Sequence, residues 1–171
     1  MVLIHTALLC EAQIFIERFK LKKISSTPKI YKNDYFILCI SGIGKENTLK
    51  NIKFIFNNYT IKKAFNIGIA GCNNKDIKIG DIFITNKTIT DIKYMNLITK
   101  NTITNTNTVN RVSLFDMEGI YFLDLSMKYI SNDNIFIFKI VSDHLNTNHI
   151  NKQFVKHLIV DKFITIKKYM L

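Results

Sequence analysis

The run Ile135–Val141 contains a single polar residue, Lys139. A strand this apolar has to be covered on both faces, because a strand with one solvated face alternates apolar and polar side chains. Other apolar runs of strand length alternate with stretches of helical period. The strand-like runs are Val2–Leu9, Ala64–Ile69 and Ile82–Ile84, and the helical stretches are Glu11–Phe19, the segment after Gly44, Asp116–Ile130 and His149–Lys168. This alternation predicts an α/β fold, a three-layer sandwich around a twisted, mixed and mainly parallel sheet.

Two further segments complete the organisation. Lys29–Tyr31 and Tyr35–Ile40 flank a turn-favouring Asn-Asp pair and predict a hairpin. Lys100–Asn110, rich in Thr and Asn, has no hydrophobic period and predicts a solvated loop or an edge hairpin. The 171 residues are 47% hydrophobic and show no linker and no internal repeat. We therefore expect one domain spanning residues 1–171.

The formal net charge is +11, from 24 basic residues against 13 acidic ones, which raises the question of an anionic partner. Nearly all of the basic residues are Lys, and Arg18 and Arg111 are the two arginines. The sequence has no basic recognition helix and no basic strand with interleaved aromatic residues, so we expect no nucleic-acid partner. Its apolar runs are far shorter than the roughly 20 residues of a membrane-spanning helix, so we expect no membrane partner.

The N-terminus and the cysteines indicate a compartment. The first residues lack the basic region and the cleavage site of a secretory signal. Cys10, Cys39 and Cys72 are odd in number, lie in or beside apolar runs and lack the spacing of a disulfide framework or a metal site. We expect buried, reduced thiols and a cytoplasmic location.

Glycines gather at the ends of predicted strands. Gly42 and Gly44 follow one strand, and Gly68 and Gly71 end another. In an open α/β sheet the ligand lies beyond the carboxyl ends of the strands, where bare backbone N–H groups suit a phosphate, a carboxylate or an attacking water. The alternative is that these glycines only permit tight turns.

Acidic residues are scarce, and several lie at the edges of the most apolar elements. Asp116 and Glu118 border a predicted helix, and Asp143 follows Ile135–Val141 and should emerge at the carboxyl edge of the sheet. A carboxylate in such a place is costly unless it is paired or used. The alternatives are an N-cap or Asx turn for Asp143, a solvated helix residue for Glu118 and a first-turn acid for Glu11.

The order of these pieces resembles the purine nucleoside phosphorylase and 5'-methylthioadenosine/S-adenosylhomocysteine nucleosidase superfamily, and it implies a nucleoside phosphorylase-like fold. Five segments that extend over most of the chain are similar to motifs of that superfamily. In chain order they are Ala7–Ala12 (ALLCEA), Ser41–Lys45 (SGIGK), Asn66–Gly71 (NIGIAG) with Lys78–Ile82 (KIGDI), Asp116–Gly119 (DMEG) and Val141–Asp143 (VSD).

The resemblance implies hydrolysis of the N-glycosidic bond of a purine nucleoside or a related N-glycoside, without a metal or another cofactor. It makes Asp143 the acid that protonates the leaving base, and Glu11 the group that orients or deprotonates the attacking water. Glu118 would accept hydrogen bonds from the ribose hydroxyls. The substrate-binding residues that it implies are Ser41, Gly42, Gly71, Met117, Glu118 and Ser142.

Two other functions stay open. One is a phosphate-dependent phosphorylase, which is less favoured because Arg18 and Arg111 match neither arginine motif of the phosphorylases. The other is a non-catalytic nucleoside-binding protein, because residues 86–112 are shorter and more polar than the corresponding segment of the superfamily. The resemblance also implies a homodimer in which a neighbouring chain contributes an apolar wall to the site.

Overall fold

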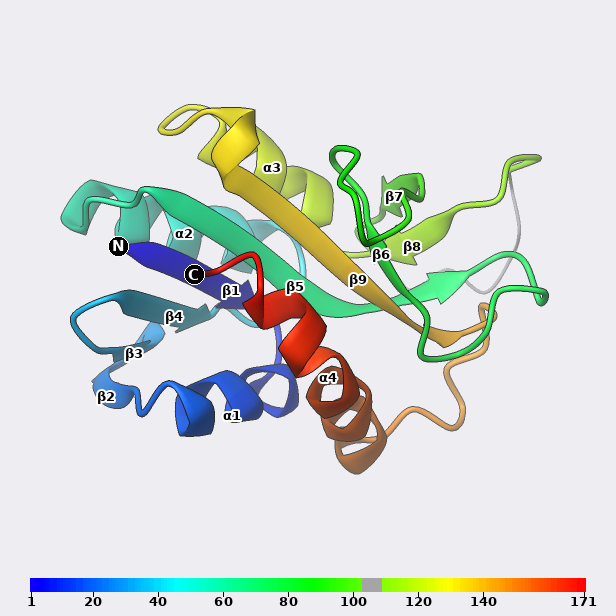
Figure 1. Cartoon of the computed structure of the whole chain (residues 1–171), viewed down its shortest axis with the longest axis horizontal. Coiled ribbons are helices and arrows are strands. Elements are labelled where there is room, and N and C mark those ends of the chain that lie inside the picture. The colour runs from blue at the N-terminus through cyan, green and yellow to red at the C-terminus, as the bar shows by residue number, and fades with distance from the viewer. Residues whose placement is uncertain (103–108) are drawn as a thin grey trace.

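A twisted nine-stranded sheet runs through the computed structural model, which describes residues 1–102 and 109–171 (Figure 1). The strands follow the order β2-β3-β4-β1-β5-β8-β7, and β9 pairs with both β5 and β6. Their bounds are β1 (Val2–Thr6), β2 (Lys22–Ser26), β3 (Lys29–Lys32), β4 (Phe36–Ile40), β5 (Lys63–Cys72), β6 (Ile82–Ile84), β7 (Leu97–Thr99), β8 (Leu114–Asp116) and β9 (Ile135–Asp143).

The centre of the sheet is parallel, and most pairs toward its margins are antiparallel, although the outermost pair β7-β8 is parallel. Strand β1 pairs in parallel with β4 and β5, and β5 pairs in parallel with β9 along almost its whole length. The hairpin pairs β2-β3 and β3-β4 are antiparallel, as are β5-β8 and β6-β9. The predicted mixed, mainly parallel sheet is confirmed, because its central strands carry crossover connections through helices.

Helices cover both faces of the sheet, which makes the predicted three layers. Helices α1 (Leu9–Arg18) and α4 (Lys152–Lys167) pack together on one face, and α2 (Lys45–Asn58) and α3 (Gly119–Ser126) pack together on the other (Figure 1). Each pair of helices closes its own hydrophobic core against the sheet. Strand β9 is buried over most of its length, as the run Ile135–Val141 predicts.

The structure corrects the helix predicted over Asp116–Ile130. Asp116 ends strand β8, which pairs with β5 and β7, and the helix begins only at Gly119 and ends at Ser126. The Asp116 carboxylate accepts the N–H of Gly119 and thereby stabilises the first turn of the helix. The predicted start lies too early because a three-residue strand has no period that marks where it ends.

Other boundaries differ less. The helix predicted to begin at His149 begins at Lys152, after the capping side chain of Asn151, which accepts the N–H of Phe154. Strand β2 was not predicted, because nearly all of its side chains are exposed at the edge of the sheet and show no alternation. Of the predicted loop Lys100–Asn110, residues 103–108 lie outside the described residues.

The cysteines lie inside the molecule, as predicted. Cys10, Cys39 and Cys72 are buried and unpaired. Within residues 1–102 and 109–171, no helix combines the length and the apolar character needed to cross a bilayer.

Candidate active site

A cavity of about 380 Å³ lies at the carboxyl edge of the sheet, where β5 and β9 end beside the N-termini of α1 and α3. Its floor is acidic and its walls are largely apolar, with Leu8, Ile43, Leu145 and Ile150 among the wall residues. Most of the site residues predicted from the sequence meet here. The predicted residues that line the cavity are Glu11, Gly71, Met117, Glu118, Ser142 and Asp143.

Asp143 reaches the cavity through an irregularity in strand pairing. The register between β5 and β9 shifts after Ala70, so that Gly71 lies opposite Asp143 and Ser142 is the extra residue. Oδ2 of Asp143 accepts the Ser142 hydroxyl at 2.7 Å, and Oδ1 accepts the N–H of Asn146 at 3.1 Å. These two bonds fix the direction in which the carboxyl group faces the cavity.

Glu11 projects from the first turn of α1 and is 3% exposed. Its Oε2 accepts the N–H groups of Ala7 and Leu8 at 3.0 and 2.8 Å, and its Oε1 accepts the N–H of Ile69 at 3.2 Å. Burial raises the pKa of Glu11 to about 7, although the N–H groups of Leu8 and Ile69 and the charge of Lys139 act in the opposite direction. Near neutral pH this carboxyl can therefore take up or release a proton.

A buried ion pair lies beneath the acidic floor. Lys139 of β9 and Asp116 of β8 are each 1% exposed at the side chain, and Nζ lies 2.7 Å from Oδ2. Burial by itself would lower the pKa of Lys139, but attraction to Asp116, Glu118 and Glu11 outweighs burial and raises it. The site therefore contains a permanent positive charge among three carboxylates.

Glu118 is the residue that precedes the first turn of α3, and it lines the cavity. Its Oε1 accepts the N–H of Gly44 at 2.7 Å, which connects the helix to the turn after β4. Burial raises the pKa of Glu118, and Lys139 opposes this rise. Met117, the preceding residue, is half-buried and lines the same cavity.

Two glycines in β5 make room for the carboxylates. A Cβ atom on Gly68 would lie 2.9 Å from Oε1 of Glu11, and one on Gly71 would lie 3.0 Å from Oδ1 of Asp143. Neither glycine has a positive φ angle, and both lie within the strand. The reason for glycine at these positions is thus close approach of a side chain, and the alternative of a tight turn does not apply to Gly68 and Gly71.

Ser41 and Gly42 lie beside the cavity but are not among its described lining residues. The Ser41 hydroxyl donates to the Gly42 carbonyl oxygen and is also bonded to His5, while the N–H of Gly42 donates to Ala7. Their polar groups are engaged within the protein. The neighbouring residue Ile43 is the one that reaches the cavity.

Sequence reasoning missed Lys139 and His5 as parts of the site. The signal for Lys139 was present, because a charged residue inside an otherwise apolar strand requires a buried partner. The partner could not be named, because Asp116 belongs to a different strand. His5 gave a weaker signal, since a single buried histidine in a strand is common.

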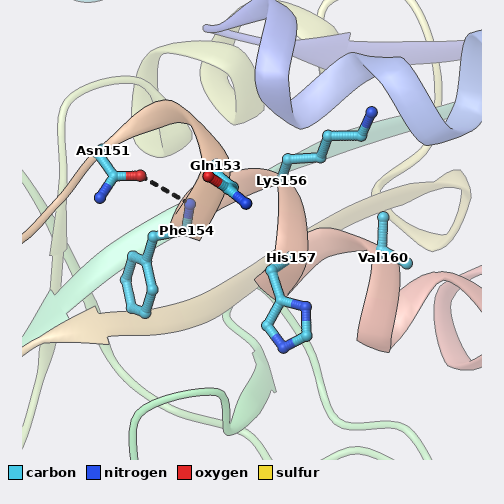
Figure 2. A pocket seen from close by; sticks show the side chains of 6 residues that line it. All are labelled: Asn151, Gln153, Phe154, Lys156, His157 and Val160. Atoms are coloured by element: carbon cyan, nitrogen blue, oxygen red, sulfur yellow. Dashed lines mark hydrogen bonds between the residues drawn. The ribbon is translucent and has the colours of Figure 1, made fainter.

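A larger hollow, of about 510 Å³, lies on the outer face of α4 (Figure 2). All of its lining side chains come from α4 and its capping residue, and Figure 2 shows the capping bond from Phe154 to Asn151. The lining residues are Asn151, Gln153, Phe154, Lys156, His157 and Val160. Side chains of one helix without a facing element form an open surface, so the candidate site is the cavity at the sheet edge.

Among residues 1–102 and 109–171, no group of His, Cys, Asp and Glu has the arrangement of a metal site.

Solved structures share this fold at low sequence identity. The 5'-methylthioadenosine/S-adenosylhomocysteine nucleosidase from Helicobacter pylori, in complex with butyl-thio-DADMe-Immucillin-A, is 15% identical with a TM-score of 0.83, over 98% of this chain and 96% of the other. The chain has the fold of these nucleosidases. Futalosine hydrolase of Helicobacter pylori is 15% identical with a TM-score of 0.82, over 99% and 96% of the two chains.

A third similar structure is the 5'-methylthioadenosine/S-adenosylhomocysteine nucleosidase from Neisseria meningitidis in complex with methylthio-immucillin-A. It is 14% identical with a TM-score of 0.81, over 98% of this chain and 97% of the other. The predicted resemblance to the nucleoside phosphorylase and nucleosidase superfamily is confirmed at the level of the fold. No family model and no curated protein matches the sequence.

The buried charge on Lys139 gives a stability prediction. Lys139→Met leaves three buried carboxylates without their cation, so we expect the free energy of unfolding to fall by about 3–5 kcal/mol at pH 8. The double variant Lys139→Met/Asp116→Asn also removes the directly paired carboxylate and should regain at least about 1 kcal/mol. Urea unfolding followed by circular dichroism measures both. A single-variant loss below about 1 kcal/mol would contradict the role given to this pair.

Proposed function

We propose that this protein hydrolyses the N-glycosidic bond of a purine nucleoside or a related N-glycoside. The main support is that one cavity brings together Asp143, Glu11 and Glu118 in a fold shared with nucleosidases and a futalosine hydrolase. Fold alone does not define a reaction, so the proposal depends on how these three carboxyl groups are held.

Asp143 is the proposed general acid. When the bond between the sugar carbon and the base nitrogen breaks, the departing base gains a negative charge that a proton on one of its ring nitrogens neutralises. The Asp143 carboxyl group would supply this proton, and Ser142 and the N–H of Asn146 hold it in place. Its position at the end of β9 assigns the base to that side of the cavity.

Glu11 is the proposed group that orients and deprotonates the attacking water. The water oxygen forms the new bond to the sugar carbon, and one water proton passes to Glu11. Since burial raises the pKa of Glu11 to about 7, its carboxylate is basic enough to accept that proton near neutral pH. Fixation by three backbone N–H groups keeps the carboxylate in one orientation.

Glu118 and Met117 are the proposed sugar-binding residues. Glu118 would accept hydrogen bonds from ribose hydroxyls, and Met117 would pack against the sugar ring. Gly71 permits the close approach of Asp143 and Leu145 to β5. Ser41 and Gly42, although implied by the resemblance, would act through the turn that they form rather than by direct contact.

The charges in the cavity favour water over phosphate as the nucleophile. Glu11 and Glu118 line the cavity, and the charge of Lys139 is already paired with Asp116 at 2.7 Å. A phosphate dianion would be repelled by these carboxylates when they are ionised. We therefore propose hydrolysis, with a sugar bearing a free hydroxyl and a free base as the products.

The proposal covers residues 1–171 as one domain, supported by a single sheet that includes all described strands. It also places the protein in the cytoplasm, where buried unpaired thiols such as those of Cys10, Cys39 and Cys72 are usual.

Asp143 provides the direct test of the function. The protein is incubated with a panel of purine nucleosides, with and without phosphate, and the released base is quantified by chromatography. We expect release without phosphate, and a loss of about 10²- to 10⁴-fold in rate for Asp143→Asn. Asp124→Asn, an exposed change on α3, is the matched control and should keep the rate. Undiminished turnover of Asp143→Asn, or formation of a sugar 1-phosphate, would contradict the proposal.

The pKa of Glu11 predicts the pH profile. Because the pKa rises from 4.5 to about 7, the carboxylate is the minor form below pH 7. The value of kcat/KM should therefore rise with pH up to an inflection near 7. Glu11→Gln should lower kcat at least about 100-fold, whereas Glu17→Gln, at an exposed position of the same helix, should not. A flat profile between pH 5 and 8 in initial-rate measurements would remove Glu11 from this role.

We further propose a homodimer that covers the mouth of the cavity. Three exposed apolar residues lie at or near the cavity in the chain. Ile43 lines the cavity and is 49% exposed. Leu9 follows a lining residue and is 44% exposed, and Ile120 lies two residues after another and is 39% exposed. Exposed apolar side chains gathered around a site are typical of a covered interface.

Light scattering after size exclusion tests the dimer, for which we expect a mass of roughly 40 kDa, twice that of the 19.9 kDa chain. Ile120→Lys should shift the protein toward the monomer, because it places a charge in the proposed interface. Ile164→Lys, at an exposed position on α4 across the sheet, should leave the mass unchanged. A fully active species of 20 kDa would contradict a shared site.

A further inference from the structure

His5 is a fully buried titratable residue that the proposed mechanism does not use. It lies in β1 opposite Asn66 of β5, and its ring stacks on Phe122 of α3 with the ring centroids 5.1 Å apart. Burial, together with the charge of Lys139, lowers the pKa of His5 to about 3. The imidazole is therefore neutral near pH 7, with one nitrogen that donates a hydrogen bond and one that accepts.

The hydrogen bonds around His5 run in one direction. We assign the ring proton to Nε2, because Nδ2 of Asn66 lies 2.7 Å from Nδ1 of His5 and the Ser41 hydroxyl donates to Gly42. The Nε2 N–H donates to Oγ of Ser41 at 2.8 Å, and the Ser41 hydroxyl donates to the Gly42 carbonyl oxygen at 2.6 Å. His5 thus sets the orientation of the hydroxyl that closes the turn after β4.

This turn continues to a carboxylate of the cavity. Gly42 and Gly44 have φ angles of 85° and 92°, a region that favours glycine, and the N–H of Gly44 donates to Oε1 of Glu118 at 2.7 Å. Phe122, which stacks on His5, lies one helical turn after Glu118 and donates its N–H to the Glu118 carbonyl oxygen. His5 therefore contacts both segments that hold Glu118.

We propose that His5 is a positioning residue for Glu118 and that it sets the preference of the cavity for ribonucleosides over deoxynucleosides. This inference rests on the proposed function, in which Glu118 accepts hydrogen bonds from sugar hydroxyls. A carboxylate with one oxygen held by an N–H presents its remaining lone pairs in fixed directions. A site built to bond a hydroxyl discriminates strongly against a substrate that lacks it, so loosening Glu118 weakens that discrimination.

Two polar variants isolate the bond between His5 and Ser41. In His5→Gln the amide nitrogen occupies the place of Nε2, so it can still donate to Ser41. In His5→Asn the shorter amide reaches only the place of Nδ1, so the bond to Ser41 is lost while that to Asn66 can form. Both variants lose the stack on Phe122. His5→Gln keeps the Ser41 bond and loses the Asn66 bond, and His5→Asn does the reverse, so the pair shows which of the two bonds matters. Ser41→Ala removes the same bond from its other end.

The first measurement is kcat/KM for the best purine ribonucleoside and for its 2'- and 3'-deoxy counterparts. We expect His5→Asn and Ser41→Ala to lower the ratio of kcat/KM for the ribonucleoside to kcat/KM for the deoxynucleoside about tenfold. Most of this change should come from a lower kcat/KM for the ribonucleoside. His5→Gln should stay within about twofold of the wild-type ratio. Equal losses on all substrates, or the same loss in His5→Gln, would make His5 a residue of general stability and overturn the proposal.

Amide hydrogen exchange at Gly44 provides a readout that needs no substrate. The Gly44 N–H should exchange at least about tenfold faster in His5→Asn than in the wild type or in His5→Gln. If the wild type hydrolyses no nucleoside while exchange follows this pattern, the proposed function fails and the positioning role of His5 stands. If nucleosides are hydrolysed and neither exchange nor the ratio responds to His5→Asn, the positioning role fails and the proposed function stands.

Discussion

The buried ion pair of Lys139 and Asp116 is the constraint on which the site depends. A charge that is 1% exposed on a central strand is tolerated only with an opposite charge in contact, because desolvation costs several kcal/mol for each ion. Asp116 is the last residue of β8, so the ion pair holds the end of β8 against β9. The following helix, α3, therefore begins at the same edge of the sheet. Glu11 and Glu118 share the attraction of the same amine. One cation thus allows several carboxylates to remain buried within one cavity.

Backbone N–H groups give each carboxylate its direction. Every acidic side chain of the site accepts at least one of them, so its orientation follows from the course of the main chain rather than from flexible partners. The pairs are Glu11 with Ala7, Leu8 and Ile69, Asp116 with Gly119, Glu118 with Gly44, and Asp143 with Asn146. Because these segments connect strands to helices on both faces of the sheet, the fold as a whole places the acids.

The carboxyl groups differ in their surroundings, and this difference suits two kinds of proton transfer. Glu11 is desolvated enough for its pKa to rise to about 7, whereas Asp143, the proposed acid, is held by the Ser142 hydroxyl and the N–H of Asn146. Environments that separate the properties of chemically similar groups are typical of sites that use one group as an acid and another as a base. Apolar side chains around these carboxyl groups lower the local polarity, which strengthens their electrostatic interactions.

The sequence alone determined the layers and the edge of the sheet at which the candidate site lies. The apolar run Ile135–Val141 required cover on both faces, and Asp143 after it had to emerge at the carboxyl edge. Only the tertiary structure decided which groups meet there. Lys139 signalled a buried partner, but Asp116 lies on a three-residue strand that has no readable period and whose pairing is not local. The turn of Ser41 faces His5 instead of the cavity for a similar reason, since the two residues lie 36 positions apart and only the pairing of β1 with β4 brings them together.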